Sequence, residues 1–122
     1  MATETELTEL VLIQGEQWPL VFWEEDEAGT LRDFTGCTVR CQIRPSRGSS
    51  TITATFTTGL ASDPDTGQPN RRITATLTAT QTAALAPGKF WIECEIIPGG
   101  VEANAEKLLP PTPLSILPEV IR

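Results

Sequence analysis

The stretch GEQWPLVFWEEDEAGTLRDFTGCTVRCQIR, from Gly15 to Arg44, decides the fold. Its first half holds a dense apolar run, Trp18 to Trp23, and its second half, Cys37 to Arg44, alternates between apolar and polar residues. Strict alternation with a period of two is typical of a strand that buries one face. The acidic, glycine-containing segment Glu24 to Gly29 separates the two runs and reads as a turn. The stretch therefore predicts two strands joined by an exposed connection.

The rest of the chain repeats this pattern of short apolar runs separated by turn residues. Including the two strands above, we expect strands at Leu7–Gln14, Trp18–Glu24, Cys37–Arg44, Thr51–Thr57, Arg72–Leu77 and Phe90–Ile97. In the fourth of these, Ile52, Ala54 and Phe56 are expected to point inward. The segment Gly59–Asn70 is rich in Asp, Pro and Gly and is expected to be a long loop.

One helical turn is expected between the last two of these runs. Thr78 and Gln81 have the spacing of a capping box, and Pro87-Gly88 ends the segment that follows. No helix long enough for a parallel crossover is predicted, which argues against an α/β fold. About seven short strands with one short helical turn predict an all-β, antiparallel β-sandwich.

Charge and composition exclude several classes of function. The 122-residue chain carries a formal net charge of −7, which argues against nucleic acid or an anionic membrane as a partner. The N-terminal residues lack the basic and apolar regions of a signal peptide, and no apolar run reaches membrane-spanning length. We expect a soluble protein made in a cytoplasm.

The three cysteines are expected to be reduced. Cys37 and Cys41 lie roughly 13 Å apart on one face of a strand, at about 3.3 Å per residue, and cannot bond to each other there. Cys94 also lies at an inward position of its strand, so all three are interpreted as buried thiols that act as small apolar side chains.

No catalytic residue is predicted, and the chain is expected not to be an enzyme. Histidine is absent, which removes the usual general base and the usual metal ligand. Glu93 and Glu95 lie roughly 6.5 Å apart at about 3.3 Å per residue, a spacing that glycosidases use, but an exposed strand face explains them as well. Neither Glu24–Glu27 nor Asp63–Asp65 offers a complete set of oxygen ligands, so no metal or other cofactor is expected.

Trp91 is the one feature that could mark a ligand site of another class. Together with Glu93 and Glu95 on the same outward face, it would form a carbohydrate-binding platform, because sugars stack on aromatic rings between polar acceptors. The alternative is that Trp91 packs under a neighbouring strand, loop or subunit.

The order of several short motifs carries a family resemblance. They are Gln14-Gly15-Glu16, Leu20–Trp23, Asp26–Gly29, Asp33–Gly36, Gln42–Arg44, Arg72–Leu77, Thr82–Leu85, Gly88–Glu93 and Lys107–Leu109. This pattern resembles small virion proteins of tailed phages, including the N-terminal domain of baseplate upper proteins that carry receptor-binding proteins. The resemblance implies an immunoglobulin-like β-sandwich that acts as a structural or attachment unit. The chain departs from that family in having a proline-rich tail in place of a plain final strand.

From this resemblance we expect a structural protein of the virion, made in the cytoplasm of the host bacterium and present in several symmetric copies. A tail, baseplate or fibre-attachment component is the first choice, a capsid decoration protein the second. The partners would be other virion proteins. Two stretches without any charge, Gly48 to Ser62 and Ile73 to Gly88, agree with a covered face or edge.

The start of the proline-rich tail sets the expected boundary between two parts of the chain. Residues 1–109 are assigned to the β-sandwich domain and 110–122 to a C-terminal strand or arm, because prolines restrict this segment as a helix or central strand. Two interpretations remain open: an arm that docks on a neighbouring subunit, or a final edge strand at Leu114–Leu117. The residues assigned to partner binding are Leu114, Ile116, Leu117, Val120, Ile121 and Trp91.

Overall fold

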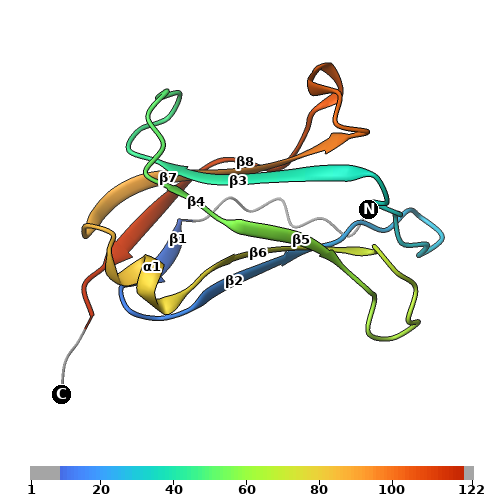
Figure 1. Ribbon diagram of the computed structural model, residues 1–122, viewed down its shortest axis with the longest axis horizontal. Helices are drawn as coiled ribbons and strands as arrows, with labels where there is room; N and C mark the ends of the chain where they lie inside the picture. Colours follow the sequence, from blue (N-terminus) through green and yellow to red (C-terminus); the bar gives the residue numbers. More distant parts are fainter. Residues whose placement is uncertain (1–8, 120–122) are drawn as a thin grey trace.

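The computed structural model describes residues 9–119 and is an all-β chain arranged in two layers (Figure 1). Its elements are β1 (Leu10–Ile13), β2 (Trp18–Phe22), β3 (Cys37–Arg44), β4 (Ala54–Thr55), β5 (Thr57–Ala61), β6 (Arg72–Leu77), α1 (Ala79–Ala83), β7 (Gly88–Pro98), the 3-10 turn η1 (Glu102–Asn104) and β8 (Glu106–Leu117). The predicted all-β class is confirmed, and the bounds of β3 and β6 match the expected ones.

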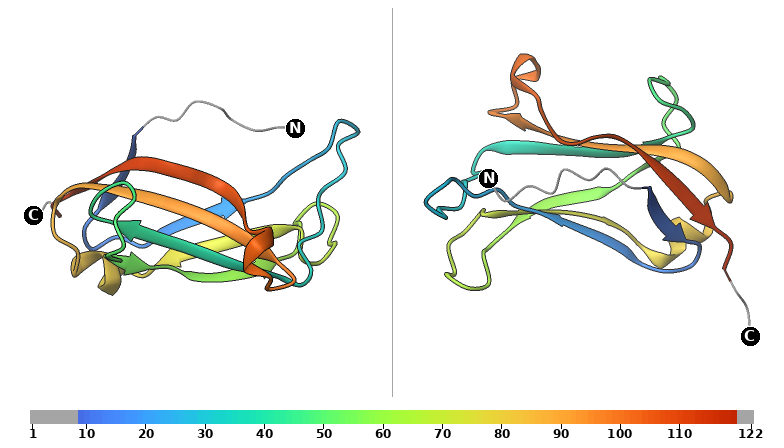
Figure 2. Two further views of the ribbon diagram at one scale, coloured as in Figure 1. Left: turned by 90° about the horizontal axis from the view of Figure 1, so that it is seen from above. Right: turned by 180° about the vertical axis from the view of Figure 1, so that it is seen from behind.

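The strands form two sheets of different size. Sheet A has five strands in the order β1-β8-β7-β3-β4, and sheet B has three in the order β2-β6-β5. The two sheets face each other along the long axis of the molecule, and α1 closes one end between them (Figure 2). The β2–β3 connection and the β5–β6 loop lie together at the opposite end.

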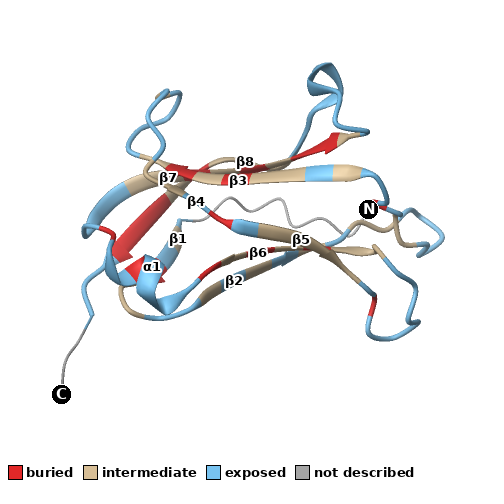
Figure 3. Cartoon of the chain, viewed as in Figure 1, coloured by how far each residue is buried: buried red, intermediate tan, exposed pale blue. Residues whose placement is uncertain are grey.

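The core lies between the inner faces of the two sheets (Figure 3). Because side chains alternate along each strand, every second residue enters this core. Cys41 and Ile43 of β3 are buried, and so are their neighbours on β7, Cys94 and Ile92. The opposing sheet contributes residues such as Leu77. A second buried cluster around Phe34, Ile73 and Ile96 fills the end near the β2–β3 connection.

The helix α1 begins at the predicted capping box. The side chain of Thr78 accepts a hydrogen bond from the Gln81 backbone, and the Gln81 side chain accepts one from the Thr78 backbone. Thr82 is buried and connects α1 to the β1–β2 turn: its hydroxyl oxygen accepts from the Gly15 N–H at 3.0 Å, and the hydroxyl donates to the Glu16 carbonyl at 2.8 Å. The helix therefore holds the point at which the chain passes from one sheet to the other.

The prediction of a wholly antiparallel fold was wrong at β1. This strand pairs in parallel with β8, with Leu10 opposite Leu114 and Ile13 opposite Leu117. The chain then turns at Gly15, whose φ of 83° lies in the left-handed region that favours glycine, and enters the other sheet as β2. Sheet A is mixed because β1 and β8 run parallel, whereas the other strand pairs of the sheet are antiparallel.

The expected strand Thr51–Thr57 is in fact divided between the two sheets. β4 pairs with β3 in sheet A, and β5 pairs with β6 in sheet B. Phe56 sits at the crossing, 4% exposed, with its N–H bonded to the Cys41 carbonyl at 3.0 Å. Ile52, expected to point inward, is 47% exposed because it precedes β4, and β5 takes over the start of the predicted loop as far as Ala61.

The tail is a strand of sheet A, which agrees with the second of the two open interpretations and not with the arm, although Leu114–Leu117 is not an edge because β1 pairs with it. β8 runs from Glu106 to Leu117 without a break at the assigned boundary between residues 109 and 110. Pro110 and Pro111 lie at a register shift, between the Ile92–Thr112 and Cys94–Leu109 pairs of β7 with β8. On its other side β1 covers only Leu114–Leu117, so this half of β8 also has an open side among the described residues. A strand can accommodate proline where the missing N–H faces such an open side.

We predict that Leu114→Ala lowers the free energy of unfolding by about 2–5 kcal/mol, because Leu114 is fully buried and its truncation leaves a cavity. Leu117→Ala, at a position 44% exposed on the same strand, is the matched control and should cost less than about 1 kcal/mol. Urea denaturation measures both. Equal small losses would restore the interpretation of this segment as an arm.

Candidate functional site

The outer face of sheet A gathers most of the residues that the sequence singled out. Outward positions of β3 lie beside outward positions of β7, with Arg40 opposite Glu95 and Arg44 opposite Trp91. On the other side of β7, Lys107 of β8 lies opposite Glu95. Three consecutive strands thus present a row of charged side chains that ends in an indole ring.

The charged residues of this face neutralise one another. The Lys107 ammonium lies 3.0 Å from Glu93 and 3.1 Å from Glu95. Arg40 pairs with Glu95 and, at 2.6 Å, with Glu102 of η1. Arg44 completes the row with its Nε 3.5 Å from a Glu93 oxygen. Both carboxylates expected on this face are therefore engaged with cations of the same chain.

Glu95 is held as a carboxylate. Burial raises its pKa, but hydrogen bonds from Arg40 and Lys107 and their charges outweigh burial, so the pKa lies below its ordinary value. A general acid of a glycosidase needs the opposite shift. In its present environment Glu95 suits a structural ion pair better than proton donation.

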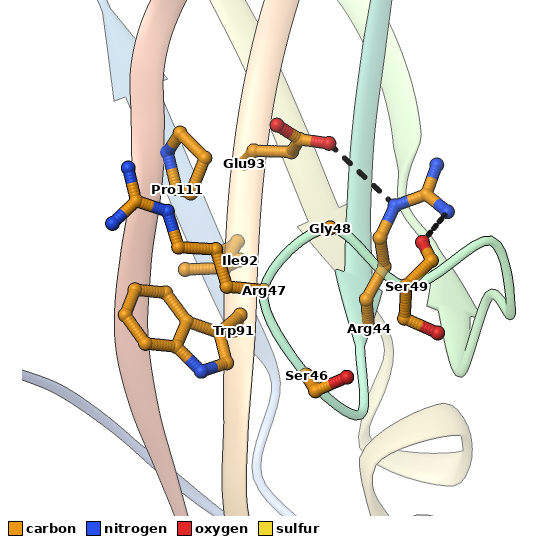
Figure 4. A pocket seen from close by; sticks show the side chains of 9 residues that line it. All are labelled: Arg44, Ser46, Arg47, Gly48, Ser49, Trp91, Ile92, Glu93 and Pro111. Carbon is orange, nitrogen blue, oxygen red and sulfur yellow. Dashed lines mark hydrogen bonds and ion pairs between the residues drawn. The ribbon is translucent and has the colours of Figure 1, made fainter.

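A pocket of about 360 Å³ lies at the Trp91 end of this row (Figure 4). It is lined by Arg44, Ser46, Arg47, Gly48, Ser49, Trp91, Ile92, Glu93 and Pro111. β7 supplies the floor, and the loop after β3 supplies one wall. The Arg47 guanidinium lies over the Trp91 ring, 5.7 Å from its centroid. Arg44 fixes the loop by donating to the Ser49 carbonyl at 2.7 Å.

The structure brings together two of the three residues of the predicted carbohydrate platform. Trp91, which is half-buried, and Glu93 line the pocket. Glu95 lies outside it, in a neighbouring depression with Arg40 and Ile52. Sequence reasoning missed Arg44 and Arg47 as lining residues. The available signal was the loop Ser46-Arg47-Gly48-Ser49-Ser50, but its contact with Trp91 depends on the pairing of β3 with β7.

The described tail residues that were assigned to partner binding do not form a common surface. Leu114 and Ile116 belong to the core of their own chain, at 0% and 1% exposure, so they are not available to a partner. Leu117 is exposed. Val120 and Ile121 lie outside the described residues.

The two acidic loops use carboxylates to close their own turns. The Asp26 side chain accepts hydrogen bonds from the N–H groups of Ala28 and Thr30, each at 2.9 Å. Asp63 is buried and accepts from Thr66, which, as the main cause, lowers its pKa. Within residues 9–119 no group of three or more Asp, Glu, Cys or His side chains is placed to hold a metal ion.

Trp23, part of the apolar run named in the sequence, is exposed and lies near these loops, and it was not predicted as a site residue. It lines a shallow pocket of about 540 Å³ with Asp63 and Arg72. The Arg72 guanidinium stacks on Trp23 at 4.4 Å from the ring centroid and pairs with Asp63 at 3.3 Å. The stack makes Trp23 a fixed part of the surface beside sheet B.

The cysteines are free thiols, as predicted. Cys41 and Cys94 are fully buried and lie opposite each other in the pairing of β3 with β7, while Cys37 is half-buried. A hydrogen bond with Cys94, together with burial, raises the pKa of Cys41 well above its ordinary value. This group is a thiol and not a thiolate at neutral pH.

Comparison with models of known protein families and with curated proteins finds no match to this chain. Among residues 9–119, the helical segments are too short to cross a lipid bilayer. Function therefore has to be inferred from the surfaces described above and from the resemblance in the sequence.

We predict that alkylation of the denatured protein adds three labels, as counted by mass spectrometry, because all three cysteines are free. Under native conditions Cys37 should react first, since Cys41 and Cys94 are shielded from solvent. A single label after denaturation would mean that Cys41 and Cys94 are joined as a disulfide.

We predict that Glu95 makes stability depend on acidity. Its pKa is lowered in the folded chain, so its contribution is present above the unfolded value of about 4.3 and is lost as the pH falls through the folded value. Glu95→Gln should reduce the loss of unfolding free energy between about pH 5 and pH 3.

The matched control for this measurement is Glu27→Gln, in the exposed β2–β3 connection. Chemical denaturation at a series of pH values compares the two variants with the unaltered chain. If Glu95→Gln retains the same acid dependence as the unaltered chain, the ion pairs of this face do not act on stability as described.

Proposed function

We propose that this chain is a structural protein of a tailed-phage virion, a tail, baseplate or fibre-attachment component that works by binding other virion proteins in several symmetric copies. Its role would be non-enzymatic. The order of sequence motifs supports the proposal. The strand pairing supports an immunoglobulin-like form of the sandwich, because the β2-β6-β5 and β8-β7-β3-β4 orders correspond to the B-E-D and G-F-C-C′ orders of that fold.

The outer face of sheet B is the observation that carries this proposal. Pro19 and Val21 of β2 lie opposite Thr76 and Thr74 of β6, which in turn lie opposite Thr57 and Gly59 of β5. None of these six residues is charged, although the whole chain carries −7. Interface cores are depleted of charge in this way.

Exposed apolar groups extend the same face. Val21 and Trp23 are each 46% exposed, and Trp23 continues the outer face beyond the end of β2. Within the described residues β2 and β5 each pair on one side only, and neither strand contains a charge that would discourage an added strand. The one charged residue of the three strands of sheet B, Arg72 at the Trp23 end of the face, is already paired with Asp63 at 3.3 Å, so a subunit that covers this sheet would bury apolar surface without leaving that charge unpaired.

A capsid decoration protein would use the same kind of surface and is the alternative position in the particle. The two differ in location and not in contact chemistry, so a density map of the particle separates them.

We predict that Val21→Glu folds normally but is excluded from particles, because a carboxylate at this exposed site would be buried without a partner in the interface. Val11→Glu is the matched control, since Val11 has a similar exposure of 47% on β1 of the other sheet. Mass spectrometry of purified particles, produced in cells that express each variant, measures incorporation.

The expected result is at least about a tenfold deficit for Val21→Glu and none for Val11→Glu. Equal incorporation of both variants would reject sheet B as the assembly face. Absence of the unaltered chain from purified particles would reject the virion role.

The pocket at Trp91 favours a second candidate function, a carbohydrate-binding module. An aromatic ring, a guanidinium and hydroxyl groups converge on a concave site at the lower end of the roughly 300–1,000 Å³ that small-molecule pockets occupy. Glu95, part of the expected platform, is not part of this pocket and is left out of the candidate. The candidate is developed and tested in the next subsection.

A further inference from the structure

The charges that line the Trp91 pocket do not cancel. Its lining holds two cations, Arg44 and Arg47, and one anion, Glu93. The Glu93 carboxylate is already shared between Arg44 at 3.5 Å and Lys107 at 3.0 Å. Arg47 has no carboxylate within 4.0 Å among residues 9–119. A chain with a net charge of −7 thus carries a locally positive pocket.

Arg44 and Arg47 differ in how firmly they are held. Arg44 donates to the Ser49 carbonyl and to the Gln42 side chain, both at 2.7 Å, so it is part of the framework. Arg47 is exposed, and the contact that places it is its stack on Trp91. Its guanidinium keeps its donors free for a ligand that reaches the indole.

Trp91 determines what kind of ligand can reach that guanidinium. The indole rises from β7, a strand paired on both sides, so the backbone that carries the ring is held in place. The apolar face of a sugar ring can pack on an indole, and a carboxylate on the same sugar can accept two parallel hydrogen bonds from a guanidinium. Arg47 lies over the ring and beside Pro111, so this exposed side chain has to move off the indole when a sugar packs there, and its donors then face the carboxylate of that sugar (Figure 4).

We propose that the pocket binds a carboxylated saccharide, of the uronic acid or sialic acid class, with Trp91 as the stacking surface and Arg47 as the partner of the carboxylate. This inference rests on the carbohydrate-binding candidate above and gives its ligand class. A guanidinium pairs with carboxylate and phosphate alike, but the lining of this pocket includes no helix N-terminus to add the backbone N–H donors that phosphate sites typically gather. An acidic peptide would offer the carboxylate without the ring that Trp91 stacks on.

The test uses isothermal titration calorimetry on the full chain, with trigalacturonic acid as the probe. Its methyl ester tests the need for the carboxylate, and a glutamate-rich peptide of the same charge tests the need for the sugar ring. The variant is Arg47→Gln. Lys89→Gln is the matched control, because it removes one positive charge from the exposed end of β7, outside the pocket. Thermal melting verifies that both variants are folded.

We expect trigalacturonic acid to bind about tenfold more tightly than its methyl ester. Arg47→Gln should lower the affinity for the acid to that of the ester, and Lys89→Gln should leave it unchanged. Affinity for the acid should also fall when the salt is raised to about 0.15 M, because the pocket is open to solvent.

Three results would overturn the inference, and they have different meanings. If the ester binds as tightly as the acid and Arg47→Gln has no effect, the acidic class is wrong while carbohydrate binding stands. If the acidic peptide binds as tightly as the saccharide, the sugar ring is not recognised. If none of the saccharides binds, the carbohydrate-binding candidate fails as well, and the virion proposal, which rests on sheet B, is untouched.

Discussion

The backbone pairing of β3 with β7, which runs from Cys37 opposite Pro98 to Arg44 opposite Trp91, controls both faces of sheet A at once. Because side chains alternate along a strand, one register decides which residues enter the core and which reach solvent. The inner face receives Cys41, Ile43 and their neighbours on β7. The outer face receives the row of ion pairs and the indole. A slip of one residue would bury the charges and expose the core, so the fold and the candidate pocket depend on the same hydrogen bonds.

The outer faces of the two sheets differ in how many charged side chains they carry. Sheet A covers its outer face with mutually paired charges, which stay solvated and give little reason for another protein to bind. Sheet B leaves threonines, Pro19 and Val21 on its outer face, and the one charged residue of its strands, Arg72, lies at the end of that face and is paired with Asp63. Threonine suits a strand whether or not it is covered, so this face can be stable before and after a partner arrives. This contrast is the basis for proposing a small-ligand site on sheet A and an assembly face on sheet B.

Local patterns predicted some elements fully and others only in part. β3 and β6 have the expected bounds because alternation along a single strand is a local property of the sequence. The capping box of α1 is likewise contained in a few residues. By contrast, the run Thr51–Thr57 is divided into β4, which pairs with β3, and β5, which pairs with β6. The sequence pattern along one strand does not say with which strands it will pair. The strand formed by the proline-rich tail was the most difficult to predict, because whether a strand can hold these prolines depends on how little of β8 pairs with β1. The pocket was half predicted: parity put Trp91 and Glu93 outward, but Arg47 reaches them from the loop after β3, which only the pairing of β3 with β7 brings beside them.

The parallel pairing of β1 with β8 has a consequence for how the molecule is made. Leu10 pairs with Leu114, so β1 cannot take its place in sheet A until β8, about a hundred residues further along, has been synthesised. Until then the inner face of sheet A, with its reduced thiols, is open to solvent, and the nascent chain has to avoid aggregation without its closing strand. The net negative charge of the chain matters at this stage, because repulsion between unfinished chains opposes their aggregation until β1 and β8 have paired.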